Sequence, residues 1–456
     1  MARIGNGDLI VVVPGILGST LYRDGRQTWG YRNISWNLYR LTARLTEDLS
    51  LPPEAFADPA LGCDDGTQVR GVLKTLGIVP GFLTIDGYDK LLRRLRARFR
   101  DDHHTIIEFP YDWRQSNEYT ARRLQTVVEP ILERRRQIHP DAGIVFFCHS
   151  MGGLVARFYA ECLDTRKLTR RIITIGTPYS GAAKALGVLA NGYAPLGSWR
   201  IRLGELARSL PSVAELLPMY ACVGPSVHAL APLVSEPVPG LPDICLERGL
   251  RFHRRIEEAI AANGNARPSY HAILSHRQTT ETWASITDDG STILHAPSNF
   301  EERGDGTVPR CSATPPEWAD DSNALFVAGR HAALQQQNSV IIQAEGIVTT
   351  RRRPMAAMDE IAVDADLHIE PGGAWEVRAE SIEGSDRLVL FVTVTDPDDG
   401  RVGVSRSLRP EGDSRYSARI PIAGPGVFRW TVHTAPTAAT PVDPVSDVLL
   451  CTDEEV

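Results

Sequence analysis

The stretch that most constrains the fold is residues 144–156, where an uncharged apolar run stops at Cys148, a polar turn follows, and a second apolar run begins. Ser150 stands at the apex of the turn, and Gly152 leaves room for the chain to reverse. A strand, a sharp turn and a helix in this order are the context that a nucleophile elbow needs, in which the turn lifts a serine hydroxyl above the carboxyl end of a sheet. Cys148 stands where the common G-x-S-x-G pattern has glycine, and because cysteine is small the turn can still close.

The size and composition describe a globular protein with a large core. At 456 residues the chain favours one large domain plus a smaller one, or two to three domains. Its hydrophobic content of 43% and charged content of 23% are ordinary for a globular protein. General nucleic-acid binders usually carry a strongly basic domain, and the net charge here is −7. We therefore expect no nucleic-acid partner.

The seven cysteines are scattered, with no C-x-x-C pair. This usage favours reduced thiols, and we expect neither a metal nor a cofactor. The first eight residues lack the apolar core of a signal peptide, and no uncharged run approaches transmembrane length. These features predict a cytoplasmic location. Asn33 and Ser35 match the glycosylation pattern, which we interpret as a chance match.

Residues 9–13 form a continuous apolar run that is closed by Pro14 and Gly15. Such a run is typical of a strand buried on both faces of a parallel sheet. In an elbow-type hydrolase, a loop after an early strand supplies one N–H of the oxyanion hole, and the residue after the nucleophile supplies the other. Ile16 and Met151 are the candidate donors. An ordinary strand-to-helix turn is the alternative interpretation of the loop.

Predicted strands and helices alternate along the first part of the chain. Residues 105–109 and 171–175 read as strands, and residues 86–99 and 118–137 read as helices, which predicts an α/β sheet. From about 187 to 300 the alternation loosens into short helical pieces, with strand material near the end at 270–275 and 282–286. We expect this insertion to be a cap that carries substrate selectivity.

The character of the chain changes near Thr349. Residues 349–354 are polar and basic and read as a linker, and beyond them the apolar pattern has a period of two between Gly, Pro and Asp turns. We expect an α/β-hydrolase domain over 1–348, a linker over 349–360 and a small β-sandwich-like domain over 361–456. The last region shows no catalytic constellation.

A serine hydroxyl needs a base to accept its proton and a carboxylate to orient that base. In the elbow class the chain order is serine, acid, histidine, which Ser150, Asp305 and His331 satisfy. Asp305 lies between two glycines, and His331 follows a short apolar run. Three histidines precede Asp305 and break the order, and His149 would point away from the nucleophile. The competing residues are His149, His271, His276, His295, Asp288, Asp289, Asp320 and Asp321.

Six segments then occur in an order that resembles the lecithin:cholesterol acyltransferase family, together with its relatives the lysosomal phospholipases and the phospholipid:diacylglycerol acyltransferases. They are residues 13–19, 110–114, 149–153, 176–181, 216–218 and 304–308. The resemblance implies an α/β-hydrolase with Ser150 as nucleophile, Asp305 as orienting acid and His331 as base. It also implies Ile16 and Met151 as oxyanion donors, and residues 111–114 as a brace near the site. The C-terminal β-rich segment lies outside the family pattern.

These observations predict a serine-dependent lipid acyl hydrolase or O-acyltransferase that works through an acyl-enzyme. The apolar cap favours an acyl-chain substrate, but the acyl acceptor, water or a lipid alcohol, stays open. The alternatives are a soluble carboxylesterase for short acyl esters and a catalytically silent module that binds lipid or a partner. Peripheral membrane contact and the partner of the C-terminal segment are also left open.

Overall fold

The computed structural model describes residues 7–30, 46–74, 77–79, 83–99, 104–191, 199–320, 324–349, 360–397, 400–422, 424–435, 438 and 440–452. Asn33, most of the expected linker and Asp321 lie outside these ranges. None of the described helices is long and apolar enough to cross a membrane. All seven cysteines fall in the described ranges and are free thiols.

A six-stranded sheet forms the centre of the molecule, and its strand order is β13-β10-β9-β8-β1-β7. Every neighbouring pair is parallel. The strands β1 and β8 are buried along their whole length, as their continuous apolar runs predict. The strands are β1 (Leu9–Val13), β7 (Thr105–Glu108), β8 (Ile144–His149), β9 (Thr169–Ile175), β10 (Ser269–Ser275) and β13 (Leu325–Val327).

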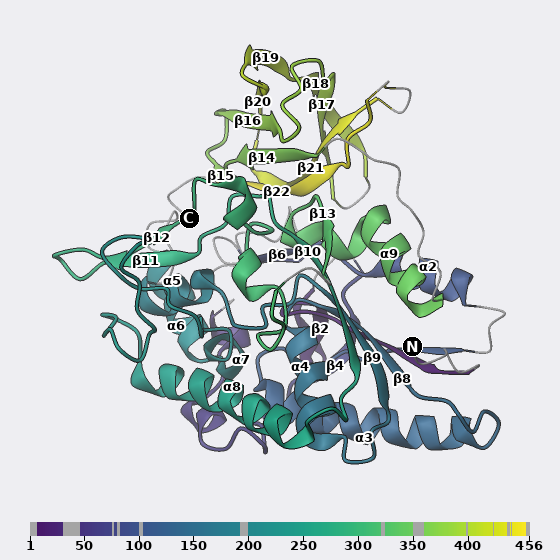
Figure 1. The fold of residues 1–456 in the computed structure, drawn as a ribbon. Coiled ribbons are helices and arrows are strands. Elements are labelled where there is room, and N and C mark those ends of the chain that lie inside the picture. Colours follow the sequence, from purple (N-terminus) through teal and green to yellow (C-terminus); the bar gives the residue numbers. More distant parts are fainter. Residues whose placement is uncertain are drawn as a thin grey trace.

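Helices cover both faces of this sheet (Figure 1). On one face α3 (Asn117–Arg136) packs on α4 (Gly152–Phe158), which lies on β8 and β9 and continues into a π-helical turn, Tyr159–Leu163. On the other face α9 (Asn338–Thr349) packs on β9, β10 and β13, with α2 (Asp89–Arg98) beside it. The predicted α/β arrangement with a parallel sheet is confirmed.

One strand corrects the expected extent of the cap. Residues 270–275 fall inside the 187–300 range, yet β10 pairs with β9 and β13 in the central sheet. Its last four residues are buried, and a short buried run cannot be assigned to a sheet from its sequence alone. The cap range is therefore divided into α5 (Ala183–Asn191), α6 (Trp199–Arg208), α7 (Pro211–Ala214) and α8 (Asp243–Asn263) before β10, and the hairpin β11 (Trp283–Ile286) and β12 (Thr292–His295) after it.

Smaller elements complete the α/β part. The strands β2 (Ser19–Arg23), β3 (Arg26–Trp29) and β4 (Gln68–Val72) form one small sheet, and β5 (Gly77–Val79) pairs with β6 (Leu83–Ile85). Short 3-10 helices span Pro53–Phe56, Phe300–Glu302, Arg310–Ser312 and His331–Gln336. The last of these leads into α9, which starts at Asn338.

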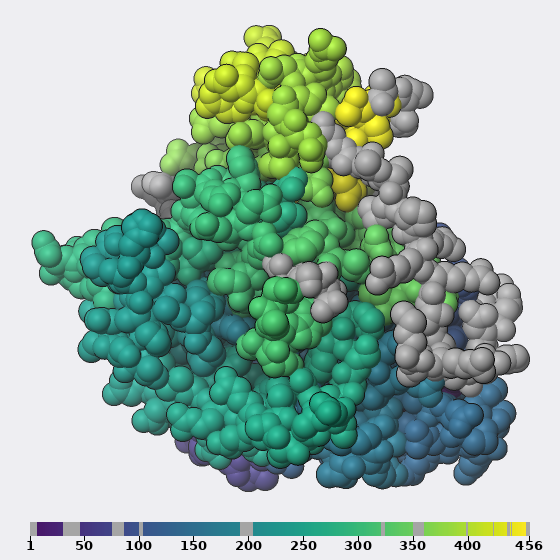
Figure 2. All heavy atoms as spheres, in the orientation of Figure 1, coloured from purple at the N-terminus to yellow at the C-terminus, as the bar shows by residue number. Residues whose placement is uncertain are grey.

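Two further sheets lie at the C-terminal end, at the top of Figures 1 and 2. One has the order β14-β16-β20-β19 and the other β15-β22-β21-β17-β18. Burial alternates along the strands, and the inner faces of the two sheets share one apolar core. In this core the ring centroids of Trp375 and Trp430 lie 5.6 Å apart. The strands are β14 (Ile361–Ala365), β15 (His368–Ile369), β16 (Ala374–Ser381), β17 (Leu390–Thr395), β18 (Val402–Ser407), β19 (Arg409–Gly412), β20 (Arg415–Pro421), β21 (Gly426–Thr434) and β22 (Val445–Cys451). We call residues 360–452 the C-terminal β region.

Candidate active site

The sharp turn after β8 holds Ser150 in an unusual backbone conformation. Its φ is +53°, a left-handed value that residues other than glycine rarely adopt. The Ser150 N–H donates to the carbonyl of Ile175 at 2.9 Å, and the Ser150 carbonyl accepts from the Thr177 hydroxyl at 2.8 Å. Since both partners belong to β9 and the turn after it, the sheet stabilises this strained turn at the carboxyl end of the strands.

Steric room explains the residues around the turn. A Cβ at Gly152 would lie 2.4 Å from the Pro14 carbonyl oxygen and 2.5 Å from that of Val13, so only glycine fits. Cys148 is fully buried, and burial raises the pKa of its thiol well above the ordinary value. The thiol therefore stays protonated and does not compete with Ser150 as a nucleophile.

The structure brings Ser150, Asp305 and His331 together from three distant parts of the chain. His331 Nε2 lies 2.9 Å from Ser150 Oγ, and His331 Nδ1 lies 2.7 Å from Asp305 Oδ2. The other carboxylate oxygen, Asp305 Oδ1, accepts from the N–H groups of Thr307 at 3.0 Å and Val308 at 2.7 Å. Because an ionised carboxylate only accepts, His331 carries its proton on Nδ1 and presents a free Nε2 to the serine hydroxyl.

Backbone contacts hold this acid and base to each other. The His331 N–H donates to the Asp305 carbonyl at 2.8 Å. Beside them, Gly176 has a φ of +58°, and a Cβ there would lie 2.9 Å from Asp305 Oδ2 and 3.2 Å from His331 Nδ1. In the sequence, Gly176 follows the predicted strand 171–175 and begins the segment 176–181 that resembles the family. Its role in leaving space for the acid–base pair is visible only in three dimensions.

The competing histidines and acids lie elsewhere. His271 contacts Ser269, and His276 lies 3.5 Å from Glu301. His295 stacks on Trp283 at the β11–β12 hairpin, whose turn contains Asp288 and Asp289. Asp320 lies on the wall of a cavity described below, and Asp321 is outside the described residues.

The loop after β1 passes directly beside the serine. A Cβ at Gly15 would lie 2.8 Å from Ser150 Cβ. The next residue, Ile16, is buried, as is Met151 after the serine. Neither the Ile16 N–H nor the Met151 N–H has a hydrogen-bond acceptor in the part of the chain that the structure describes. Two unpaired donors next to the Ser150 hydroxyl are suited to receive a negative charge.

Residues 111–114 brace this loop, as the family resemblance implies. The Tyr111 hydroxyl donates to the Pro14 carbonyl at 2.8 Å, and the Tyr111 N–H donates to Ser19 Oγ at 3.1 Å. The indole N–H of Trp113 donates to the Ser19 carbonyl at 3.3 Å. The loop that carries Ile16 is therefore anchored at both of its ends.

A buried ion-pair cluster supports the brace in turn. Arg114 is completely buried and pairs with Asp112 at 2.7 Å and with Asp65 at 2.9 Å. Burial alone would raise the pKa of Asp65, but the Arg114 guanidinium outweighs it and the pKa falls to about 2. The carboxylate thus stays ionised and paired at any pH near neutrality.

The His149 side chain links the loop after β1 to His331 and makes no hydrogen bond to the Ser150 side chain. Its Nε2 lies 3.1 Å from the His331 carbonyl oxygen, which can only accept, so Nε2 carries the proton. Its Nδ1 then accepts from the Tyr88 hydroxyl at 2.9 Å, and that hydroxyl accepts from the Gly15 N–H at 2.8 Å. Burial lowers the pKa of His149 well below its ordinary value, which keeps the ring neutral. The sequence predicts only that His149 points away from Ser150 and that Tyr88 lies within a helical stretch over 86–99.

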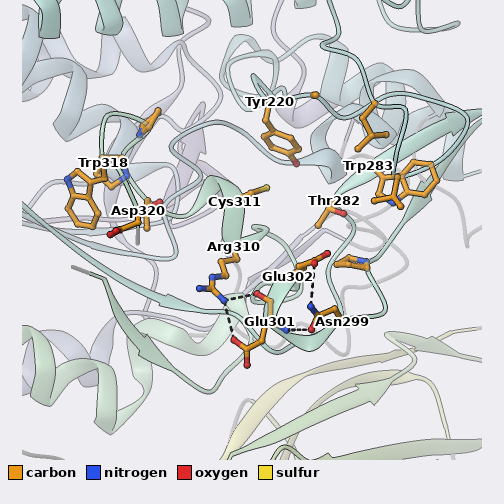
Figure 3. A pocket seen from close by; sticks show the side chains of 17 residues that line it. Tyr220, Thr282, Trp283, Asn299, Glu301, Glu302, Arg310, Cys311, Trp318 and Asp320 are labelled. Atoms are coloured by element: carbon orange, nitrogen blue, oxygen red, sulfur yellow. Dashed lines mark hydrogen bonds and ion pairs between the residues drawn. The ribbon is translucent and has the colours of Figure 1, made fainter. Parts of the chain in front are cut away.

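A cavity of about 720 Å³ opens between the β11–β12 hairpin and the loop after Asp305 (Figure 3). Its walls include Tyr220, Trp283 and Trp318, and the Arg310 side chain contacts Glu301 at its edge. The lining contains neither Ser150 nor His331, so the candidate site rests on the hydrogen-bonded constellation and not on this cavity.

The part of the chain around Ser150 is similar to a known protein family. Residues 83–282 match the sequence model of the family described as lecithin:cholesterol acyltransferase. The matched stretch is less than half of the chain, and it supports the resemblance to this family. The match includes Ser150, the brace and β9, and it ends before Asp305 and His331.

Two known proteins match this chain over part of its length. A lysosomal phospholipase A and acyltransferase of Homo sapiens is 26% identical over 249 residues, which are 46% of this chain and 56% of that protein. The uncharacterized protein YJR098C of Saccharomyces cerevisiae is 37% identical over 106 residues, which are 22% of this chain and 15% of that protein. The chain thus spans little more than half of one relative and a small part of the other.

The chain also matches solved structures, at low similarity. The CARDB domain of PF1109 from Pyrococcus furiosus matches 21% of this chain and 93% of that chain, at 12% identity and a TM-score of 0.16. A likeness of this size carries no inference about the chain.

Proposed function

We propose that the chain is a serine-dependent enzyme that hydrolyses or transfers the acyl group of lipid esters. The observation that carries the proposal is the hydrogen-bonded line from Ser150 Oγ through the His331 ring to Asp305. The family match and the relationship to a human lysosomal phospholipase A and acyltransferase support an ester of a lipid as the substrate.

The first half of the reaction follows from the protonation state of His331. Ser150 Oγ attacks the ester carbonyl carbon while His331 Nε2 takes the hydroxyl proton. Asp305 accepts the Nδ1–H bond throughout, and so stabilises the imidazolium that forms. The tetrahedral intermediate then expels the alcohol, which receives the proton from Nε2, and an acyl-enzyme on Ser150 remains.

The developing negative charge would be held by the N–H groups of Ile16 and Met151. Both are unpaired among the described residues and lie beside the nucleophile. Each such donor contributes about 3 kcal/mol to stabilising the transition state. The firm anchoring of residues 14–19 keeps the Ile16 donor in place without reorganisation during the reaction.

The sheet and the elbow also support a finer description of the fold. We propose that residues 1–348 form an α/β-hydrolase domain, because Ser150 follows an interior strand of a parallel sheet at the carboxyl edge where Asp305 and His331 also gather. In this division residues 349–360 are a linker and 361–456 a separate β domain.

The second half of the reaction depends on what attacks the acyl-enzyme. Water gives net hydrolysis, and a lipid alcohol gives transfer. In either case His331 Nε2 takes the proton of the attacking hydroxyl, and Ser150 leaves with that proton restored.

A fluorophosphonate probe tests the proposal on the folded full-length chain. We expect covalent labelling at Ser150, identified by peptide mass spectrometry, and no labelling of Ser150→Ala. The same substitution should lower kcat on phospholipid esters by about 10⁴-fold or more with an unchanged melting temperature. Acyl products measured with and without added lipid alcohol then separate hydrolysis from transfer.

Two results would contradict the proposal. One is a folded parent protein that the probe does not label at Ser150. The other is a Ser150→Ala variant that turns over lipid esters at the parent rate, since the nucleophile would then lie elsewhere.

A further inference from the structure

The C-terminal β region contacts the loops that carry Asp305 and His331. Figure 1 places β14, β21 and β22 next to the α/β part at this end of the sheet. The strand β22 packs on the 3-10 helix His331–Gln336. Three sets of polar contacts join the two parts here. Each set involves a residue next to Asp305 or His331 in the sequence, either directly or through one hydrogen bond to its backbone.

The first contact is made by Arg330, the residue before the base. Its guanidinium pairs with Asp447 on β22 at 3.1 Å and donates to the Val363 carbonyl on β14 at 2.7 Å. Both charged side chains are only 8% exposed. A buried charge is costly to leave unpaired, so this pair strongly favours one position of the backbone at 330–331.

The second contact is made by Gln278 on the side of the acid. Its backbone exchanges hydrogen bonds with Gly304, the residue before Asp305, at 2.9 and 3.2 Å. Its side-chain amide donates to the Ile361 carbonyl and accepts from the Val363 N–H, both at 3.2 Å. Gln278 is fully buried and therefore ties the backbone beside Asp305 to the edge of β14.

The third contact reaches the residue after the base. The Asp86 N–H donates to the Ala332 carbonyl at 2.8 Å. The Asp86 carboxylate forms an ion pair with Arg429 on β21. The C-terminal β region thus holds the backbone on both sides of His331.

We propose that the C-terminal β region is a positioning element for the acid–base pair, and that Arg330 and Gln278 are its positioning residues. This inference rests on the proposed function of Ser150, Asp305 and His331. In this proposal the C-terminal β region touches neither the substrate nor the reacting atoms. It sets the distances between His331, Asp305 and Ser150, so it controls kcat and not substrate binding.

The test uses Asp447→Asn in the full-length chain, which removes the charge with little change of shape. Ester turnover and the rate of fluorophosphonate labelling at Ser150 are measured well below the melting temperature. We expect kcat and the labelling rate to fall together by about 10- to 100-fold, because small misplacements of catalytic groups have effects of this size. KM should stay within about twofold of the parent, because the substrate contacts are untouched.

Glu161→Gln is the matched control. Glu161 has a buried side chain and an ion pair of 2.9 Å with Arg267, and it belongs to the π-helical turn Tyr159–Leu163 and to neither loop. The kcat of Glu161→Gln should equal the parent value even if its melting temperature falls as much as that of Asp447→Asn. A second variant is Gln278→Asn, whose shorter side chain cannot reach Ile361 and Val363 on β14, and it should lower kcat by a similar factor. Arg330→Lys keeps the charge and should recover part of the activity that Arg330→Ala loses.

The outcomes separate this inference from the function beneath it. If the parent is labelled at Ser150 but Asp447→Asn and Gln278→Asn keep the parent kcat, the positioning role is wrong and the proposed function stands. If Glu161→Gln loses as much kcat as Asp447→Asn, the effect is one of general stability and the inference is overturned. If the parent itself is not labelled, both fail together.

Discussion

The proposed nucleophile and the proposed acid–base pair are held in two different ways. Ser150 is positioned by its own tight turn, in which its φ is +53°, and by the two strands beside β8. The end of β1 limits the space at Gly152, and the end of β9 accepts the Ser150 N–H. Asp305 and His331 lie in loops beyond the strand ends, and Gln278, Asp86 and the C-terminal β region hold them. The serine thus depends on steric fit, whereas its partners depend on long-range polar contacts.

This contrast predicts different responses to substitution. Changes at the elbow should act through crowding and affect packing as well as activity. Changes around the acid and base should act through hydrogen bonds and affect activity with smaller losses of stability. The four predictions below test this division, in order of decreasing effect on turnover.

Asp305→Asn should have the largest effect outside the serine itself. The amide can still accept from Thr307 and Val308, but it can present an N–H to His331 Nδ1, which favours the wrong ring tautomer. We expect kcat to fall by about 10³- to 10⁴-fold with a nearly unchanged melting temperature. Steady-state kinetics and thermal melting measure both quantities. A large fall in melting temperature would show that the acid loop, like the elbow, is fixed by packing.

Gly152→Ala should reduce activity by about 100-fold and also lower stability. The added methyl group meets two carbonyl oxygens of β1 and the loop after it, and these cannot move without shifting Ile16. Gly424→Ala in the C-terminal β region is the control, since a Cβ there meets nothing within 4 Å. Turnover close to the parent in Gly152→Ala would mean that the elbow tolerates crowding.

Tyr88→Phe should lower kcat by about tenfold. The change leaves the Gly15 N–H and His149 Nδ1 without their shared partner, at a cost of about 1–3 kcal/mol of stability. Tyr179→Phe removes another buried hydroxyl, one bonded to Thr174 at 3.0 Å, and serves as the control. Equal kinetics in the two variants would show that His149 and Tyr88 do not connect the elbow side to the base.

Glu215→Gln should leave turnover unchanged and alter only the pH dependence of stability. Glu215 is fully buried, and burial raises its pKa from 4.5 to about 8. A raised folded pKa means that the stabilising contribution is complete below about pH 4.5 and is lost as the pH rises through 8. The parent should therefore lose more stability than the variant between pH 5 and pH 9, by an amount on the order of a few kcal/mol.

Chemical denaturation of both proteins at several pH values measures this difference. The same slope in parent and variant would contradict the raised pKa. A change in kcat would show that this buried carboxyl, outside both regions of the comparison, nevertheless reaches the site.

Local pattern in the sequence was sufficient for the elbow, the parallel strands and the order of Ser150, Asp305 and His331. Apolar runs mark buried strands and small residues mark tight turns, and both signals lie within a few residues of the chain. The order of serine, acid and histidine along the chain matches that of a known catalytic arrangement. The same rules assigned the C-terminal strands, because their period of two reflects one buried and one exposed face.

Only the tertiary structure decided the partners of these residues. Nothing local marks β10 as a strand of the central sheet, Tyr88 as the partner of His149, or Gln278 and Arg330 as the links to the C-terminal β region. Each of these contacts joins groups that are distant along the chain, and each becomes favourable only after folding has buried both partners away from water. The amino-acid sequence by itself therefore determined which groups could react, and the packing of the two parts decided how they are held.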